Sequence, residues 1–91
     1  MLKARTTRQF EKDYKLIVKQ GKDADKLTDV MELLTQEVVL DKKFKDHKLT
    51  GDYIGHRECH IEPDWLLIYH KNAKENAIAF VRTGSHSDLF E

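Results

Sequence analysis

The sequence contains a single cysteine, Cys59, which excludes an internal disulfide framework and a zinc site built from several cysteines. It also lacks any apolar run long enough to cross a bilayer. The charged residues within positions 1–5 are not followed by an apolar stretch, so we expect no signal peptide. A length of 91 residues leaves room for one small domain, spanning residues 1–91. Together these absences predict a cytoplasmic protein with no membrane partner.

The chain also has no net charge, because its 16 Lys and Arg residues balance its 16 Asp and Glu residues. A neutral chain is not a generic nucleic-acid coat protein. The balance conceals a basic block of +5 in residues 1–22 and an acidic block of −5 in residues 23–41. Within the basic block, spacings of three and four predict a basic stripe along one helix face: Arg8, Lys12, Lys15, Lys19 and Lys22. This basic stripe is either a solvated face or a surface for phosphates or an acidic partner.

Apolar residues are plentiful enough for a folded core, because Leu, Ile, Val and Phe make up 24 of the 91 residues. Their helical spacing after Thr6 and Thr7, both suitable N-caps, predicts a helix that ends at Gly21. A second helix is expected to start at Asp23 or Asp25. Its predicted buried face consists of Leu27, Val30, Met31, Leu34 and Val38.

The C-terminal half changes to the period of two that is typical of strands. Three strands are expected there, at residues 56–61, 65–69 and 77–83. A short edge strand is expected near the N-terminus, at residues 2–5. This order predicts an α+β fold, in which an N-terminal helical hairpin packs on one face of a small, mainly antiparallel sheet of three to five strands. The other face stays open and is where we expect a functional site.

Histidine is abundant, with five in the chain: His47, His56, His60, His70 and His86. Because imidazole titrates near neutral pH, two histidines can give and take a proton in one reaction. An arginine beside them can bind a phosphate and stabilise the charge of its transition state. Two histidines and an arginine are therefore a minimal set for cleaving RNA without a metal. Any single histidine is more often a polar surface residue or a satisfied core residue than a catalytic one.

Metal binding is the rival use of these histidines. His56 and His60 share a face of the predicted strand, but they lie about 13 Å apart, too far for one ion. Cys59 points to the opposite face and is expected to be a small buried hydrophobe. The spacing thus predicts no metal site. Trp65 fits either a core indole or a platform on which an RNA base stacks.

Three blocks of the C-terminal half carry a family pattern: FKDHKLTG at residues 44–51, HRECHIEPDWLLIY at 56–69 and RTGSHSDLF at 82–90. Together they closely resemble the YafQ branch of the RelE/ParE superfamily, the toxins of bacterial toxin–antitoxin modules. The resemblance implies an endoribonuclease that cuts messenger RNA in the ribosomal A site and uses no metal or other cofactor. It also implies a co-encoded antitoxin, commonly one that binds DNA.

Carried over motif by motif, the resemblance implies five catalytic residues: His47, His60, Asp64, Arg82 and His86. We expect His86 to be the general acid and Arg82 to stabilise the phosphate. His47 and His60 are candidates for the base or for phosphate contacts, and Asp64 either orients an imidazole or transfers a proton itself. The residues expected to contact RNA are Lys45, Arg57, Trp65 and Phe90.

Two questions stay open at this level. Strict alternation puts Arg82 on the same face as Ile78 and Phe80, so either a bulge re-aims the strand end or Phe80 walls the site. For function, the alternatives are a gyrase-blocking toxin of the same fold without nuclease activity and a plain interaction domain. His56 and His70 match no motif position and are predicted to be surface residues.

Overall fold

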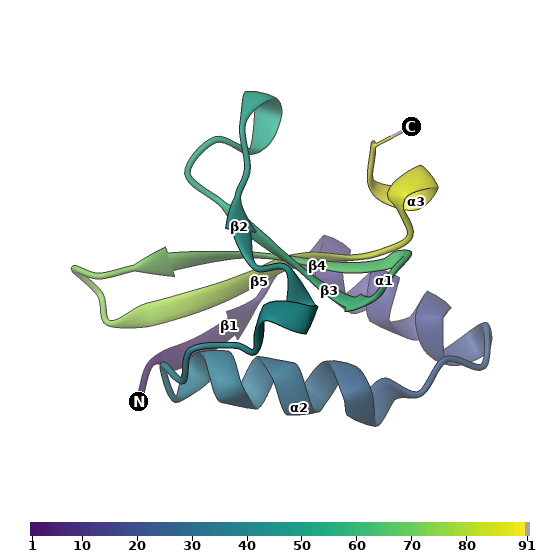
Figure 1. Ribbon diagram of the computed structural model, residues 1–91, viewed down its shortest axis with the longest axis horizontal. Coiled ribbons are helices and arrows are strands. Elements are labelled where there is room, and N and C mark those ends of the chain that lie inside the picture. The colour runs from purple at the N-terminus through teal and green to yellow at the C-terminus, as the bar shows by residue number, and fades with distance from the viewer. Residues whose placement is uncertain (91) are drawn as a thin grey trace.

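Residues 1–90 are described by the computed structural model, and they form a five-stranded mixed sheet with two helices on one face (Figure 1). The strand order is β1-β5-β4-β3-β2, in which β1 runs parallel to β5 and the other neighbours are antiparallel. The elements are β1 (Lys3–Thr6), α1 (Arg8–Lys19), α2 (Ala24–Thr35), β2 (His47–Lys48), β3 (Arg57–Glu62), β4 (Trp65–Asn72), β5 (Ala77–Gly84) and α3 (His86–Phe90). Short 3-10 turns lie at η1 (Lys42–Phe44) and η2 (Gly51–Tyr53). The predicted α+β class is confirmed.

Polar caps delimit both long helices at the predicted positions. The Thr7 hydroxyl accepts a hydrogen bond from a backbone N–H of α1 at 3.0 Å, and the Asp23 carboxylate caps α2 in the same way at 3.1 Å. Gly21 follows α1 with a φ of 81°, a conformation that favours glycine. The prediction for Val38 was wrong: α2 ends before this residue, which is 45% exposed. No helix within residues 1–90 has the length and apolar character needed to span a membrane.

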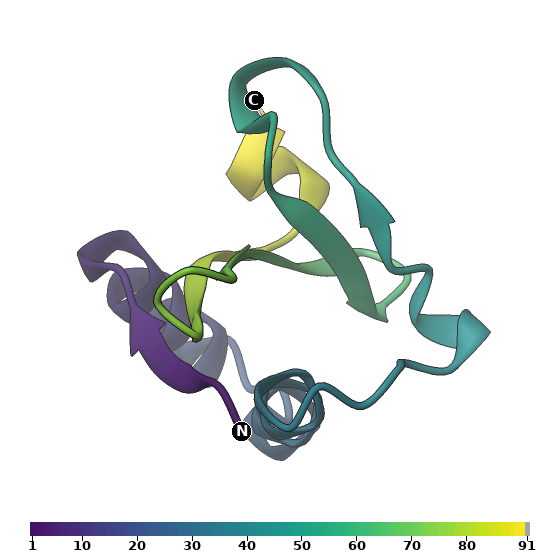
Figure 2. The same ribbon diagram turned by 90° about the vertical axis from the view of Figure 1, so that its left-hand side faces the viewer.

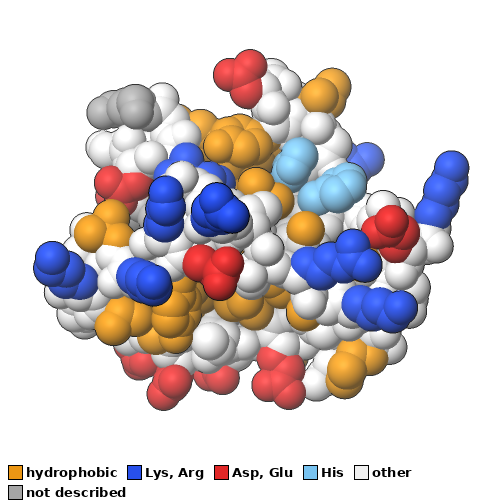
Figure 3. Space-filling model, turned by 180° about the vertical axis from the view of Figure 1, so that it is seen from behind, with side chains coloured by type: hydrophobic (Ala, Val, Ile, Leu, Met, Phe, Trp, Pro, Cys, Tyr) orange, Lys and Arg blue, Asp and Glu red, His pale blue; other side chains and the backbone are white. Residues whose placement is uncertain are grey.

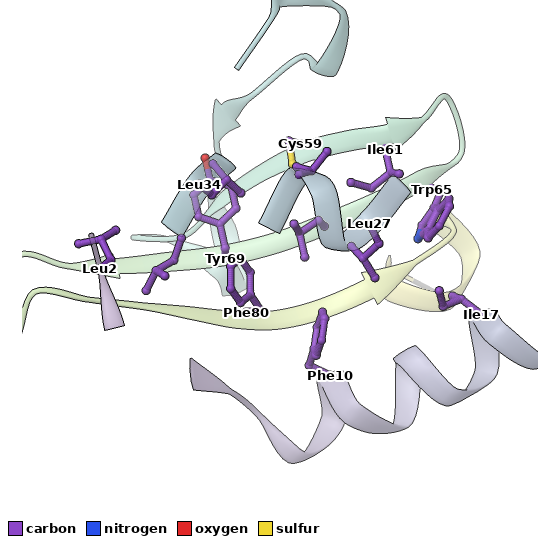
Figure 4. Close-up of a cluster of buried hydrophobic side chains, with 13 residues drawn as sticks. Leu2, Phe10, Ile17, Leu27, Leu34, Cys59, Ile61, Trp65, Tyr69 and Phe80 are labelled. Carbon is purple, nitrogen blue, oxygen red and sulfur yellow. The ribbon is translucent and has the colours of Figure 1, made fainter. Parts of the chain in front are cut away.

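The main core fills the space between the sheet and the two helices (Figure 4). Its side chains come from both helices and from one face of the sheet, and include Phe10, Ile17, Leu27, Leu34, Trp65, Tyr69 and Phe80. Trp65 is fully buried, and its Nε1–H donates to the Thr83 hydroxyl at 3.0 Å. Cys59 is fully buried, which confirms the expected small buried hydrophobe, and its burial raises the pKa of the thiol to about 12.

The opposite face of the sheet is bordered by α3 and by the loop of residues 49–56. Both rise away from α2, as Figure 2 shows. A small second cluster joins α3 to this face, because Leu89 packs with Leu66 and Ile68 of β4. This open face is therefore walled on two sides by short segments of chain.

A bulge in β5 decides the direction of Arg82. Ile68 of β4 pairs with Arg82, whereas the next residue, Tyr69, pairs with Phe80, so Val81 is an extra residue in β5. Arg82 consequently lies on the open face with Ile68, although Phe80 points into the core. Of the two alternatives left by the sequence, the bulge is correct.

Candidate active site

Three side chains from neighbouring strands form the centre of the site. Alternation along β3 places Glu58 and His60 on the open face, because Cys59 between them points into the core. His47 of β2 is the residue that pairs with Glu58 across the antiparallel strands. His47 Nε2 lies 3.0 Å from Glu58 Oε2, and His60 Nε2 lies 3.8 Å from the same oxygen.

The contacts of His47 allow its pair with Glu58 to hold a proton. His47 Nδ1 lies 2.6 Å from the carbonyl oxygen of Lys45, which can only accept, so Nδ1 carries a hydrogen. His47 Nε2 faces the carboxylate at 3.0 Å. This contact requires a further proton between Nε2 and Oε2, held either on an imidazolium or on a carboxylic acid. The pair can therefore exchange one proton with a bound molecule.

Glu58 combines burial with an unpaired oxygen. The residue is only 5% exposed, and its Oε1 atom has no hydrogen-bond partner within residues 1–90. An unsatisfied buried oxygen is destabilising, so its presence points to a use in binding or proton transfer. The sequence predictions missed Glu58. A signal was available, because a residue two positions before His60 in a strand shares its face.

His86 and Asp64 form the other half of the site. Asp64, in the β3–β4 turn, uses Oδ1 to accept the backbone N–H of His86 at 3.0 Å and the Nδ1–H of its ring at 2.7 Å. These hydrogen bonds, the backbone one foremost, lower the pKa of Asp64 and keep it ionised. The His86 ring lies 5.8 Å from the His60 ring, centroid to centroid. The structure thus brings together four of the five predicted catalytic residues in one cluster: His47, His60, Asp64 and His86.

The fifth predicted catalytic residue, Arg82, lies on the same face of the sheet, across β4 from Glu58. The strand register aligns Glu58, Ile68 and Arg82 in one row, so the backbones of Glu58 and Arg82 are about 10 Å apart. Asp13 of α1 binds the guanidinium through Nε at 2.8 Å and Nη2 at 3.2 Å. The hydrogen bonds that Arg82 donates to Asp13 raise the pKa of Arg82, so its guanidinium is a fixed cation beside the histidine cluster.

The two aromatic residues expected to contact RNA differ in their surroundings. Phe90 of α3 is 48% exposed, and its ring lies 6.5 Å from that of His86 and 5.9 Å from that of Tyr53. Phe90 is therefore accessible to a base at the rim of the site. Trp65 is fully buried, because its position in β4 shares the core face with Tyr69. The platform role suggested for Trp65 was wrong, and its alternative as a core indole is correct.

The two basic residues that were predicted to contact RNA, Lys45 and Arg57, also differ in their surroundings. Lys45 is exposed and borders a hollow of about 480 Å³ that opens beside His60 between α2 and β3. Arg57 precedes Glu58, so alternation directs it to the other face of the sheet. There its Nε donates to Asp46 at 3.2 Å. Arg57 therefore faces away from the histidine cluster and forms an ion pair with Asp46, so its predicted RNA contact lies outside this cluster.

The central group can also hold a metal ion. His47, Glu58 and His60 each offer one ligand atom, and these atoms lie within 4.8 Å of one another. Imidazole nitrogen and carboxylate oxygen suit Zn²⁺ and similar ions. The sequence argument considered spacing within one strand, and it missed this group because the ligands meet across β2 and β3. A metal there would replace the proton shared by His47 and Glu58.

The basic stripe lies on the solvent side of α1 and just beyond its end. Of its five members, Lys22 is partly buried and the others are exposed. Figure 3 shows Lys and Arg side chains gathered on this side of the molecule. The stripe is therefore available to a partner with acidic groups or phosphates.

Comparison with known proteins gives consistent matches along the chain. The family described as the bacterial toxin of type II toxin–antitoxin systems, YafQ, matches residues 2–91. The mRNA interferase toxin YafQ of Escherichia coli strain K12 is 45% identical over 83 residues, covering 90% of this chain and 88% of the relative. A metal-bound toxin from Helicobacter pylori matches with a TM-score of 0.93 and 46% identity, over 99% of this chain and 100% of the other. The toxin chain of an E. coli DinJ–YafQ complex matches with a TM-score of 0.90 and 40% identity, over 100% of both chains.

Proposed function

Because the chain belongs to the YafQ family of toxins from bacterial type II toxin–antitoxin systems, we propose that the histidine cluster on its open sheet face is the RNA-cleaving centre. The E. coli relatives are named mRNA interferase toxins, and this chain is such an endoribonuclease. The two alternatives without nuclease activity, a gyrase-blocking toxin and a plain interaction domain, are therefore set aside.

Glu58 acts as the general base in this proposal. It does so through its pair with His47, whose side chain is 49% exposed and whose Nε2 lies 3.0 Å from Oε2, because the unpaired Oε1 is itself buried. The proton of an RNA 2′-hydroxyl passes to this pair. The 2′-oxygen then attacks the adjacent phosphorus and forms a 2′,3′-cyclic phosphate. His60, 3.8 Å from the same carboxylate, is placed to contact the phosphate.

His86 acts as the general acid. Asp64 accepts its Nδ1–H, and as a carboxylate stabilises the imidazolium form. The Nε2–H can then protonate the 5′-oxygen that leaves the phosphorus. The side chain of His86 is 54% exposed, so a nucleotide can reach it.

Arg82 stabilises the charge that develops on the phosphate. Its guanidinium presents several N–H donors in a plane, and Asp13 occupies only Nε and one hydrogen of Nη2. Phe90, Lys45 and the hollow beside His60 are proposed to hold the flanking nucleotides. Cleavage by these groups needs no metal ion.

A cognate antitoxin is the expected protein partner. An E. coli YafQ toxin is found in complex with DinJ, and a free nuclease of this kind would stop its host from growing. The basic stripe on α1 offers one docking surface for acidic groups of the antitoxin, and the cluster itself offers another. Messenger RNA on the ribosome is the substrate, and this supports our proposal that the protein acts in the cytoplasm.

One observation carries this proposal: His60 lies between the Glu58–His47 pair and the Asp64–His86 pair, so a base and an acid share one surface. The test is incubation with translating ribosomes followed by mapping of the RNA ends. We expect upstream products that end in a 2′,3′-cyclic phosphate or a 3′-phosphate. Products with a 3′-hydroxyl and a 5′-phosphate would contradict attack by the 2′-hydroxyl.

A further inference from the structure

His56 and His70 form a second pair of imidazoles, which the proposed RNA cleavage does not use. The two residues stand one step beyond the Arg57–Tyr69 pair in the antiparallel register of β3 and β4. Their ring centroids are 5.1 Å apart, and the ring planes are inclined by 39°. Alternation places both rings on the open face of the sheet.

Backbone carbonyls near Nδ1 favour the same tautomer in both rings. His70 Nδ1 lies 3.0 Å from the carbonyl oxygen of Gly55, and His56 Nδ1 lies 3.4 Å from that of Ile54. Because a carbonyl oxygen only accepts, each Nδ1 carries a hydrogen and each neutral ring has a lone pair on Nε2. Histidines that bind metals usually donate their other ring N–H to such an acceptor. Both rings are therefore prepared as nitrogen ligands.

We propose that His56 and His70 bind one divalent transition-metal ion, Zn²⁺, Ni²⁺ or Cu²⁺, through their Nε2 atoms, with water completing the coordination. Imidazole nitrogen suits these three ions. Two imidazoles on a tetrahedral ion, with metal–nitrogen bonds of about 2.0–2.1 Å, place their ring centroids about 5 Å apart. The observed separation of 5.1 Å fits this arrangement. Both residues are partly exposed, so an ion and its water ligands can reach them.

This site is distinct from the His47–Glu58–His60 group. His56 and His60 share a face of β3, but four residues along a strand separate them by about 13 Å. One ion cannot bridge that distance with bonds of about 2 Å. The proposed site at His56 and His70 is therefore separate from the histidine cluster of the proposed active centre.

An ion at His56 and His70 would restrain the loop of residues 49–56. Tyr53 of this loop lies 5.8 Å from the His56 ring and 5.9 Å from the Phe90 ring, centroid to centroid. The ion would tie the start of β3 to β4 and hold Tyr53 against Phe90. We expect Zn²⁺ to raise the melting temperature of the chain through this site.

The test is a Zn²⁺ titration of the full chain, followed by NMR of the imidazole nitrogens. We expect the Nε2 signals of His56 and His70 to shift together in one binding step. The same response should persist in a Glu58→Gln variant, which weakens the other metal-binding group. In the His56→Gln variant, the His70 signal should no longer respond to Zn²⁺. The rise in melting temperature that Zn²⁺ causes should also be smaller in this variant than in the wild type.

Two results would overturn the proposal. One is an unchanged pair of Nε2 signals at saturating Zn²⁺. The other is a response of His70 that survives His56→Gln in a folded chain, because one imidazole alone would then account for it. If His56→Gln does not fold, His70→Gln tests the same site from the neighbouring strand.

Discussion

Asp13 of α1 takes the place of a missing strand beside the end of β5, and from there it holds Arg82. The pairing of β1 with β5 stops at Phe80, so the following backbone N–H groups of β5 face no strand on that side. Asp13 Oδ2 accepts the backbone N–H of Thr83 at 3.2 Å and the Nε–H of Arg82 at 2.8 Å. One buried carboxylate therefore completes the sheet edge and orients the cation of the proposed active site.

Replacing Asp13 should impair both stability and cleavage. In Asp13→Ala, the Thr83 N–H and the Arg82 guanidinium lose their acceptor, which we expect to cost about 1–3 kcal/mol of the free energy of unfolding. Cleavage should fall because the guanidinium is no longer held in place. Thermal melts and single-turnover cleavage on programmed ribosomes measure the two effects. Glu11→Ala, an exposed change on the same helix, is the matched control; wild-type cleavage by Asp13→Ala would show that Arg82 needs no anchor.

Replacing Glu58 should separate chemistry from folding. Glu58→Gln keeps the shape of the side chain but removes the proposed base, so we expect single-turnover cleavage to fall about 10²–10⁴-fold. The melting temperature should change little, because the buried carboxylate already has an unpaired oxygen. Glu75→Gln is the control, since Glu75 lies in the β4–β5 turn, outside the hollow, and pairs with Arg5. Equal cleavage by the two variants would remove Glu58 from the mechanism.

His86 is the probe of the general acid. Its side chain is 54% exposed, so we expect His86→Ala to change the free energy of unfolding by no more than about 0.5 kcal/mol. As the general acid, His86 should accelerate cleavage about 10²–10⁴-fold, so its removal should slow cleavage by that factor. The variant should fold and still bind the antitoxin, yet lose cleavage and toxicity. His70→Ala should remain toxic; a folded His86→Ala that cuts at the wild-type rate would exclude His86 as the acid.

The Asp64–His86 contact predicts a dependence of stability on pH. The pKa of Asp64 is lowered in the folded chain, so the contact contributes fully above the ordinary carboxyl pKa, about 3.9. That contribution is lost as the pH falls through the lowered folded-state pKa. We expect Asp64→Asn to be slightly less stable than the wild type near pH 7, because the Asp64 side chain is 71% exposed. The melting temperatures of the wild type and Asp64→Asn should converge as the pH is lowered. A difference in melting temperature that stays constant with pH would mean that the carboxylate charge is not involved.

Removal of metal ions tests whether His47, Glu58 and His60 work as acid–base groups or as ligands. We expect the rate of cleavage to survive chelation with EDTA, provided that the ribosome keeps its magnesium. The reason is that the proposed mechanism moves protons between side chains and RNA. The measurement is single-turnover cleavage with and without the chelator. Loss of cleavage that Zn²⁺ restores would assign these three residues to a catalytic metal instead.

Local patterns in the sequence were enough to predict much of this protein. Thr7, Gly21 and Asp23 delimit the helices where their capping chemistry predicts, since a cap depends on residues within one turn. The change from a period of about 3.6 to a period of two predicted helices followed by strands. The three motif blocks predicted the family and the histidines of the site. All of these signals arise between residues close together in the chain.

Contacts between distant residues were decided only by the tertiary structure. Glu58 meets His47 because β2 pairs with β3 in one register, and Asp13 meets Arg82 because α1 lies beside the free edge of β5. The bulge at Val81 turns Arg82 to the open face. Each of these arrangements depends on strand register or helix packing, which is set by burial of the whole core. Local alternation raised the bulge only as one of two alternatives, and it gave no sign of the two contacts between distant residues. The sequence therefore determined which chemical groups are present, and the fold determined which of them can exchange a proton.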